Sequence, residues 1–141
     1  MTAPIEELAR TGVLIYPPKG HSMLPLLREE RDLMVIQKGT GEYRKYDAVL
    51  FQRNDGELVL HRVLRIEPER CRIQGDNTFY SELVRKEQIL GKLTQILRNG
   101  KIISTSDKKY RLFVRLWWAV YPLRRLAARL RGCIGRIRRL R

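Results

Sequence analysis

Apolar and polar residues alternate in short runs along the first hundred residues of the chain. Asn54-Asp55-Gly56 marks one turn between such runs. Asn99-Gly100 marks a second, because this dipeptide accepts the positive φ of a tight hairpin turn. The hairpin predicts a further strand over residues 101–105. A short helix is predicted over residues 4–10. The runs themselves are rich in Val, Ile, Leu and aromatic residues, as β-strands are: residues 13–16, 32–37, 47–52, 57–66, 70–74 and 89–97. The pattern predicts a mainly β body.

The hydrophobic period changes after Asp107. Pro122 lies within the new pattern, and because it lacks a backbone donor and clashes with the preceding turn, we expect a kink or a break there. We therefore predict a β domain over residues 1–106 and a helical tail over residues 107–141. The apolar residues of the tail recur at alternating steps of four and three, on one side of a helix: Leu112, Leu116, Ala119, Leu123, Leu126, Leu130, Cys133, Ile137 and Leu140.

Positive charge is concentrated in this tail. The formal net charge of the chain is +14, and the tail contains a single acidic residue, Asp107. Such a tail attracts phosphate, either on nucleic acid or on lipid headgroups. The tail also carries the amphipathic rings that are favoured at headgroup depth: Tyr110, Trp117, Trp118 and Tyr121.

Three interpretations of residues 110–141 follow from this composition. Binding to an anionic membrane surface is the first, and docking on a partner helix is the second, because the four-three spacing suits both. The apolar stripe would alternatively pack on the β body. Nucleic acid is not favoured as a partner, since no base-reading motif accompanies the charge.

The remaining composition bears on location and cofactors. Residues 1–12 lack the apolar centre of a signal peptide, and the apolar run at 112–121 is half of the ~20 residues that a membrane-spanning helix needs. Cys71 and Cys133 lie far apart and belong to no zinc-binding cluster. We expect a cytoplasmic protein, peripheral at the inner leaflet of the cell membrane, with no metal and no cofactor.

The chemistry of the chain centres on Ser22, which lies in the stretch GHSMLP. A serine is a poor nucleophile at neutral pH and needs a base within hydrogen-bond reach. His21 is adjacent and would point to the opposite face of an extended backbone, so His61, in an apolar strand, is the better candidate. Asp76, in a turn after a strand, is a candidate to orient His61. The simpler alternatives are a turn hydroxyl for Ser22, a core histidine for His61 and turn formers for Asp76-Asn77.

Four motifs, in one order, resemble those of type I signal peptidases. GHSMLP resembles their Ser-Met-x-Pro box and YDAVLF their Gly-Asp-x-Val-x-Phe strand, LHRV resembles the box that holds the general base, and QGDN with ILGKL resembles the closing boxes. The histidine of HRV is similar to that of the endoplasmic-reticulum and archaeal branch, whereas the bacterial enzymes use lysine. The resemblance covers about residues 13 to 97 and implies a signal-peptidase-like β core with serine endopeptidase activity.

The resemblance also implies roles for individual residues. Ser22 would be the nucleophile, with its backbone N–H facing the oxyanion; His61 would be the general base and Asp76 the supporting carboxylate. Residues expected to shape the turn, line the substrate cleft or support the site are Met23, Pro25 and Asn77.

The sequence departs from the family pattern in three places, of which the first is the amino-terminal transmembrane anchor common to signal peptidases, which we expect to be missing. Tyr46 replaces a glycine, and the second acidic residue expected after GDN has only Ser81 or Glu82 as candidates. Arg62, next to the predicted base, is expected to be a solvated strand residue.

The expected function is cleavage of a leader or signal-like segment from a precursor peptide. An extended substrate would pair with a strand edge, with small residues beside the cleaved bond. One alternative is a catalytically inactive fold that binds peptides or docks on membranes. The other is a self-cleaving repressor-type peptidase, which is disfavoured because those proteins use lysine as the base and only a short segment precedes Ser22.

Overall fold

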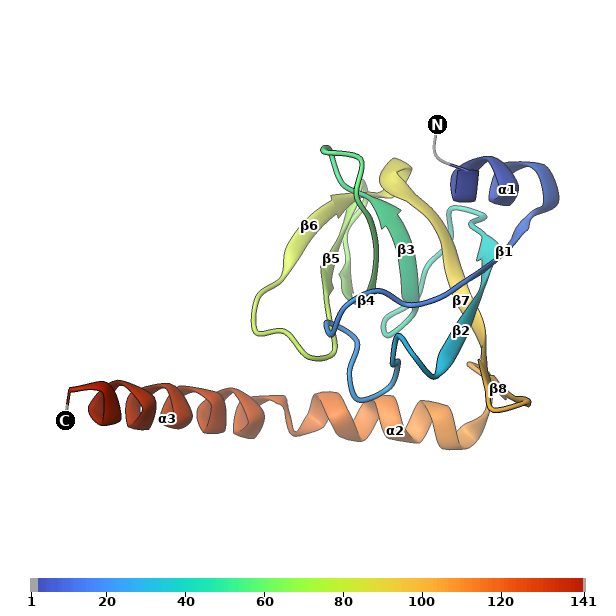
Figure 1. Ribbon diagram of the computed structural model, residues 1–141. Helices are drawn as coiled ribbons and strands as arrows, with labels where there is room; N and C mark the ends of the chain where they lie inside the picture. Colours follow the sequence, from blue (N-terminus) through green and yellow to red (C-terminus); the bar gives the residue numbers. More distant parts are fainter. Residues whose placement is uncertain (1–2, 141) are drawn as a thin grey trace.

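Residues 3–140 are described by a computed structural model, in which eight antiparallel strands form one curved sheet (Figure 1). The strand order is β1-β2-β7-β3-β4-β5-β6, and β8 pairs with the second half of β7, on the edge whose first half pairs with β3. The strands are β1 (Val13–Tyr16), β2 (Asp32–Lys38), β3 (Ala48–Gln52), β4 (Leu58–Ile66), β5 (Arg70–Gln74), β6 (Glu82–Arg85), β7 (Ile89–Arg98) and β8 (Lys101–Ser104). The predicted mainly β body is therefore confirmed.

Most strand predictions agree with the structure to within a residue, and the hairpin at Asn99-Gly100 joins β7 to β8 as expected. Helix α1 (Ala3–Thr11) covers the predicted amino-terminal helix, and a 3-10 turn, η1 (Lys86–Gln88), precedes β7. Strand β6 was not predicted, because its four residues contain only two apolar side chains and are flanked by polar sequence.

Strand β3 lies between two hydrophobic clusters. Val49 and Phe51 belong to one cluster with residues of β4, β5, β6 and β7, whereas Ala48 and Leu50 belong to a larger one that includes α1 and β2. Alternate side chains of a strand point to opposite faces, so a strand buried on both faces reads as a continuous apolar run. This explains why DAVLFQ contains no polar alternation.

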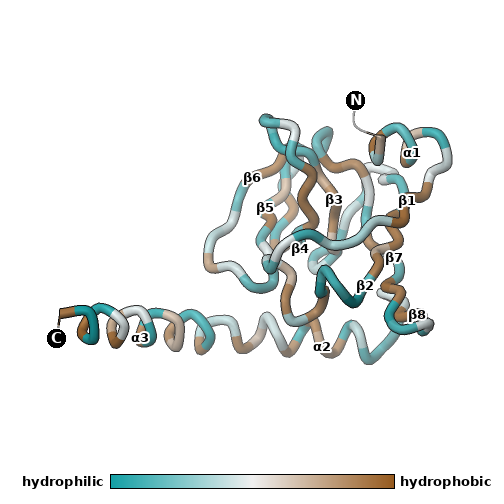
Figure 2. Tube along the Cα trace, in the orientation of Figure 1, coloured by the Kyte–Doolittle hydropathy of each residue, from teal (hydrophilic) through white to brown (hydrophobic). Residues whose placement is uncertain are grey.

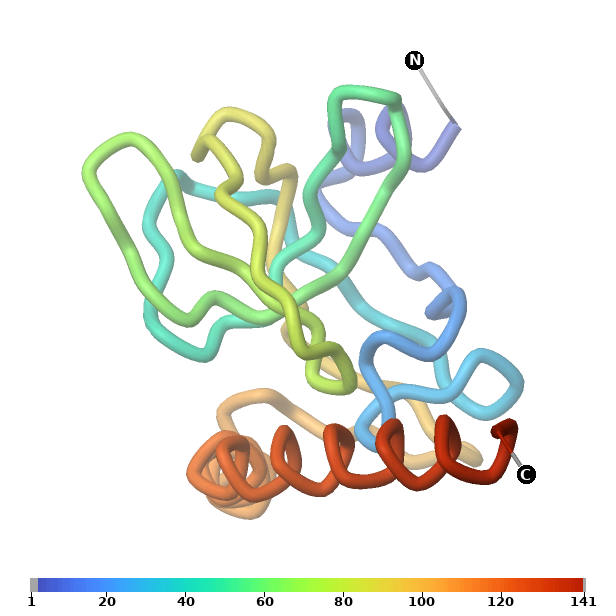
Figure 3. Tube along the Cα trace, turned by 90° about the vertical axis from the view of Figure 1, so that its left-hand side faces the viewer, coloured from blue at the N-terminus to red at the C-terminus, as the bar shows by residue number. Residues whose placement is uncertain are grey.

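The tail forms two helices, α2 (Lys108–Ala119) and α3 (Tyr121–Arg139), separated at Val120. The two helices run in different directions, as the views of Figure 1 and Figure 3 show together. Pro122 lies in the first turn of α3, where its missing N–H leaves no hydrogen bond unmade. The predicted break at Pro122 is confirmed.

Helix α2 packs on the larger cluster through Tyr110, Val114 and Trp118. These are not the residues of the predicted apolar stripe, of which Leu112 and Leu116 are more than half exposed. The interpretation in which the stripe packs on the body is therefore wrong. No residue of α3 is buried. The part of the tail that extends away from the body is therefore α3 alone, and not the whole of residues 107–141.

Among the helices of residues 3–140, none combines the length and hydropathy needed to cross a bilayer.

Candidate active site

Ser22 and His61 line the same groove, a cavity of about 630 Å³. One wall comes from the end of β1 and the loop that follows it, residues 16–23, and the other from the first half of β4, residues 58–61. The walls are mostly apolar, and Tyr80 lies at the margin. The groove brings together two residues that are 39 positions apart in the chain because the loop after β1 folds back beside β4.

Ser22 lies in a turn and is partly exposed. Within residues 3–140, neither its hydroxyl nor its backbone N–H hydrogen-bonds a protein group, although the neighbouring Leu24 N–H donates to the His21 carbonyl. A hydroxyl that only closed a turn would bond to nearby backbone. The turn-hydroxyl interpretation therefore finds no support in the geometry, and both donors of Ser22 are free to meet a ligand.

Gly75 is the point at which the segments carrying Ser22 and His61 come together. A Cβ atom on Gly75 would lie 2.7 Å from the Ser22 carbonyl oxygen and 3.1 Å from His61 Nε2. The next residues fix this approach: the Asn77 N–H donates to the Ser22 carbonyl at 2.8 Å, and Asn77 Nδ2 donates to the His21 carbonyl at 3.1 Å. Asn77 thus holds the serine loop through its backbone and its side chain.

His61 is almost fully buried, with 3% of its surface exposed. Its Nδ1 lies 3.4 Å from Glu82 Oε1, so the second nitrogen, Nε2, is the one that faces Gly75 and the serine loop. Burial lowers the pKa of His61 below its ordinary value, against the opposite effect of the Glu82 carboxylate. The imidazole is therefore neutral at neutral pH, the state that a general base needs.

Glu82 is itself held by Arg53. Arg53 Nη2 donates to Glu82 Oε1 at 2.8 Å and its Nε donates to Oε2 at 3.1 Å, while Nη1 donates to Glu57 at 2.7 Å. A carboxylate bound at two points by a guanidinium has a fixed orientation. Glu57, Arg53, Glu82 and His61 therefore form a connected polar network along one side of the groove. This network fixes the Glu82 carboxylate, which faces His61 Nδ1.

Asp76 does not occupy this position. Its carboxylate accepts two hydrogen bonds from Arg62, both at 2.8 Å, and a third from Trp118 Nε1 at 3.0 Å. Glu82, and not Asp76, lies against His61 Nδ1, which corrects the predicted role of Asp76. The physical reason is the buried guanidinium of Arg62, which takes up both carboxylate oxygens.

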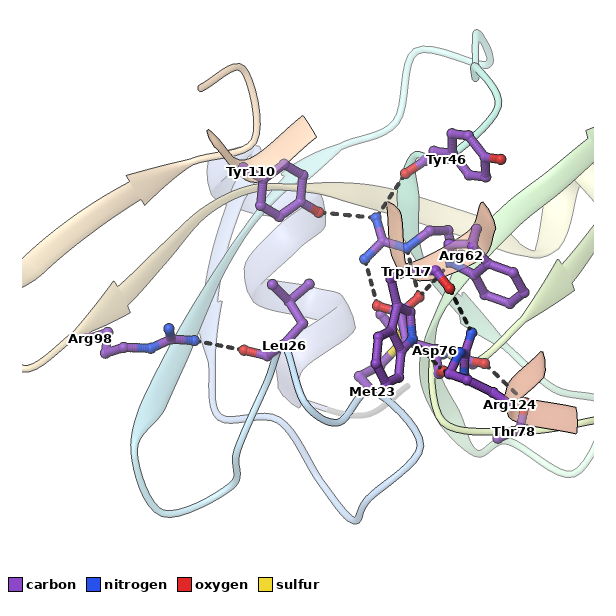
Figure 4. A network of polar contacts seen from close by, with 12 residues as sticks. Met23, Leu26, Tyr46, Arg62, Asp76, Thr78, Arg98, Tyr110, Trp117 and Arg124 are labelled. Carbon is purple, nitrogen blue, oxygen red and sulfur yellow. Dashed lines mark hydrogen bonds and ion pairs between the residues drawn. The ribbon is translucent and has the colours of Figure 1, made fainter. Parts of the chain in front are cut away.

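Arg62 is fully buried, which corrects the expectation that it is solvated. Beyond Asp76, it donates to the Tyr46 carbonyl at 2.9 Å and to the Tyr110 hydroxyl at 3.1 Å, as Figure 4 shows. The Arg62–Asp76 pair thereby joins β4, the loop after β5 and helix α2. Tyr46 has a φ of 75°, in the left-handed region that favours glycine, the residue that the family resemblance implies at this position.

The α2–α3 junction braces the same loop from outside. Trp117 Nε1 and Arg124 Nη1 both donate to the Asp76 carbonyl, at 2.8 Å and 3.1 Å (Figure 4). Gln74 Nε2 donates to the Tyr121 hydroxyl at 3.1 Å. The loop that carries Gly75 and Asn77 is thus fixed by the tail as well as by the sheet.

The far end of the serine loop is held by Asp32. Its carboxylate accepts hydrogen bonds from Arg31, Arg98 and the Arg28 N–H, and Arg98 also donates to the Leu26 carbonyl at 2.6 Å. Burial alone would raise the pKa of Asp32, but the hydrogen bonds from Arg98 and Arg31 lower it to about 2. Ser22 therefore lies in a loop that is anchored at both ends.

Of the other two residues predicted to line the cleft, one lies in the groove and one does not. Met23 is buried, lines the groove and accepts the Asp76 N–H at its sulfur, at 3.5 Å. Pro25 is exposed and does not line the groove, so its predicted place in the cleft is wrong.

Sequence reasoning missed Gly75 and Arg53 as parts of the site. The glycine of QGDN was a signal for close backbone approach, but nothing local indicated that Arg53, in the turn before β4, reaches Glu82.

No protein-family model matches the chain, and no curated protein or solved structure is significantly similar to it.

Proposed function

We propose that this protein is a serine endopeptidase in which Ser22 is the nucleophile and His61 the general base. The observation that carries the proposal is the meeting of the two residues in one groove, around a glycine that leaves no room for a side chain. The neutral, buried imidazole and the unbonded hydroxyl support it. The resemblance to type I signal peptidases points to the same two residues.

In the proposed reaction, Ser22 Oγ attacks the carbonyl carbon of the scissile peptide bond while His61 Nε2 takes the hydroxyl proton. The imidazolium that forms is stabilised by Glu82 at Nδ1, whose own orientation Arg53 fixes. The free backbone N–H of Ser22 would face the oxyanion. His61 then returns the proton to the leaving amine, and water hydrolyses the acyl-enzyme by the reverse sequence of proton transfers.

The groove suits an extended peptide as substrate. Strand β4 pairs with β3 from Leu58 onward but with β5 only from Arg62 onward. In the described part of the chain, the outer edge of residues 58–61 is therefore without a strand partner, and it faces the groove. A peptide can add to such an edge through its main chain, with alternate side chains entering the apolar walls. A leader or signal-like segment of a precursor peptide is a substrate of this kind.

Cleavage of a mixture of synthetic peptides, followed by mass spectrometry, tests the proposal. We expect the wild-type protein to cleave a subset of peptides, and Ser22→Ala and His61→Ala to lose the activity. His21→Ala is the matched control, because His21 also lines the groove but is exposed and makes no side-chain contact with Glu82. Circular dichroism would establish that each variant is folded.

Two results would contradict the proposal. Cleavage by Ser22→Ala at the wild-type rate would remove the serine from the mechanism. Peptide binding in the groove without cleavage by the wild-type protein would support the alternative of an inactive peptide-binding fold.

A further inference from the structure

Helix α3 extends away from the β body and packs on it only at its beginning (Figure 1). Arg124 fixes that beginning, because its guanidinium lies 3.9 Å from the centre of the Trp117 ring and donates to the Trp117 and Asp76 carbonyls. From residue 129 to residue 140 every residue is exposed. The direction of α3 is thus set by the body, while most of its surface is free.

Both tail helices carry exposed apolar side chains, which we together call the exposed stripe: Leu112 and Leu116 on α2, and Leu123, Leu126, Leu130, Ile134 and Ile137 on α3. Each of these side chains is between 54% and 68% exposed. Figure 2 shows the alternation of hydrophobic and hydrophilic residues along both helices. Exposed apolar side chains that recur along a helix in this way mark an interaction site.

The rest of the α3 surface is cationic. The helix has no acidic residue and seven arginines, spread over the sides and the back of the stripe: Arg124, Arg125, Arg129, Arg131, Arg136, Arg138 and Arg139. Among the described residues, none of the last six pairs with a carboxylate of the chain. The occupant of the stripe must therefore supply negative charge around an apolar interior.

The combination of an apolar stripe and surrounding arginines distinguishes between the possible binding partners of the tail. Nucleic acid would neutralise the arginines but leave the stripe in water. A partner helix would cover the stripe but would leave the arginines on its back without counter-charges. An anionic bilayer surface satisfies both, because the acyl region takes the leucines and isoleucines while headgroup phosphates surround the helix sides.

The aromatic residues on which the sequence-based membrane interpretation relied have another role. Trp118 and Tyr110 are buried against the body, and Trp117 is hydrogen-bonded to the Asp76 carbonyl. Membrane contact thus falls to the aliphatic stripe and the arginines.

We propose that the exposed stripe binds to the surface of membranes that contain anionic phospholipids. In the bound state, α3 lies at the membrane interface, parallel to the bilayer plane. Because Arg124 joins α3 to the loop that carries Gly75, membrane docking would also hold the groove at a fixed position relative to the bilayer. The lipid proposal rests on the tail alone and does not depend on peptidase activity.

Co-sedimentation with vesicles tests the proposal on the full chain. We expect binding to vesicles of phosphatidylcholine with about a third phosphatidylglycerol and little binding to phosphatidylcholine alone, since the arginines need anionic headgroups. Leu130→Glu should weaken binding tenfold or more. Ile102→Glu is the matched control, because Ile102 is similarly exposed but lies on β8, at the end of α2 opposite to α3, and the change in charge is the same (Figure 1). It should bind nearly as well as the wild-type protein.

Absence of binding to the anionic vesicles would overturn the proposal. Equal losses for Leu130→Glu and Ile102→Glu would also overturn it, because charge alone would then account for the binding. A dimer in which the stripe is shielded from solvent, and which vesicles do not dissociate, would also contradict the proposal. The stripe would then be an interface between two copies of the protein.

Discussion

A methyl group at residue 75 would collide with both halves of the proposed catalytic pair, since a Cβ there lies 2.7 Å from the Ser22 carbonyl oxygen and 3.1 Å from His61 Nε2. We therefore expect Gly75→Ala to lower kcat/KM about 100-fold, the cost of a displacement of about 1 Å in a catalytic group. Gly132→Ala, where the added Cβ meets no atom within 4 Å, is the control and should keep full activity. Wild-type activity in Gly75→Ala would show that the pair does not depend on this close approach.

The pH dependence of the reaction should report the environment of His61. Because burial lowers its pKa below the ordinary value of 6.5, the imidazole is mostly unprotonated at pH 7. Activity should be constant near neutrality and fall as the pH drops, with a midpoint below 6.5 in kcat/KM. A midpoint above 6.5 would contradict the assignment of His61 as a buried, neutral base.

Glu82 is expected to act through His61, as a positioning residue. Glu82→Gln removes the charge that raises the His61 pKa and leaves Arg53 facing the ring, so the acidic limb should move to still lower pH while kcat falls about tenfold or more. Glu67→Gln is the control, because Glu67 pairs with Arg70 and does not line the groove. A Glu82→Gln variant with an unchanged pH profile would show that the carboxylate is only structural.

Sequence motifs identified Ser22 and His61, but not the carboxylate beside the histidine. Glu82 was a candidate only because the family pattern expects a second acid after GDN, while Asp76 was the obvious choice from its position in the motif. Which carboxylate is free for His61 depends on Arg62, whose partners Asp76 and Tyr110 are 14 and 48 positions away. No local pattern shows that an arginine between two strand residues will be buried.

At the scale of elements, helix α2 is a part of the body. Trp118 fills the core and donates to the Asp76 carboxylate. Trp118→Phe keeps the apolar ring but removes a buried hydrogen bond to a charged group, so the free energy of unfolding should fall by about 1.5–3 kcal/mol. Denaturation in urea would measure it. Leu116→Ala, on the exposed face of the same helix, should change stability by about 0.5 kcal/mol or less. Equal stability of the two variants would contradict the bracing role of Trp118.

Except for β6, the strands were predictable because each carries its own pattern, whereas the packing of the tail was not predictable. The regular four-three spacing of Leu112 and Leu116 made the stripe conspicuous, yet the face that packs on the body contains Tyr110, Val114 and Trp118. These three residues recur every four positions and would also form one face of a helix. Tyr110 and Trp118 carry polar groups whose partners, Arg62 and Asp76, are distant in the sequence, so the sequence alone did not show which face is covered.

At the scale of the whole molecule, the two tail helices should differ in what their removal does. A chain that ends at residue 125 loses no buried residue of α3, so its thermal stability and peptidase activity should match those of the full chain while binding to anionic vesicles is lost. A chain that ends at residue 106 loses α2, exposes the core beneath Tyr110 and Trp118, and should be strongly destabilised. Thermal denaturation and vesicle co-sedimentation of both truncations would check this. Unfolding of the longer truncation would contradict it.

The most direct measurement of the central claim is covalent labelling of the whole protein with a serine-directed acylating probe, followed by peptide mapping. The account predicts a single modified residue, Ser22, and loss of the label in His61→Ala but not in His21→Ala, with all three proteins folded. Labelling of Ser22 to the same extent in His61→Ala, or labelling of another serine in place of Ser22, would contradict it.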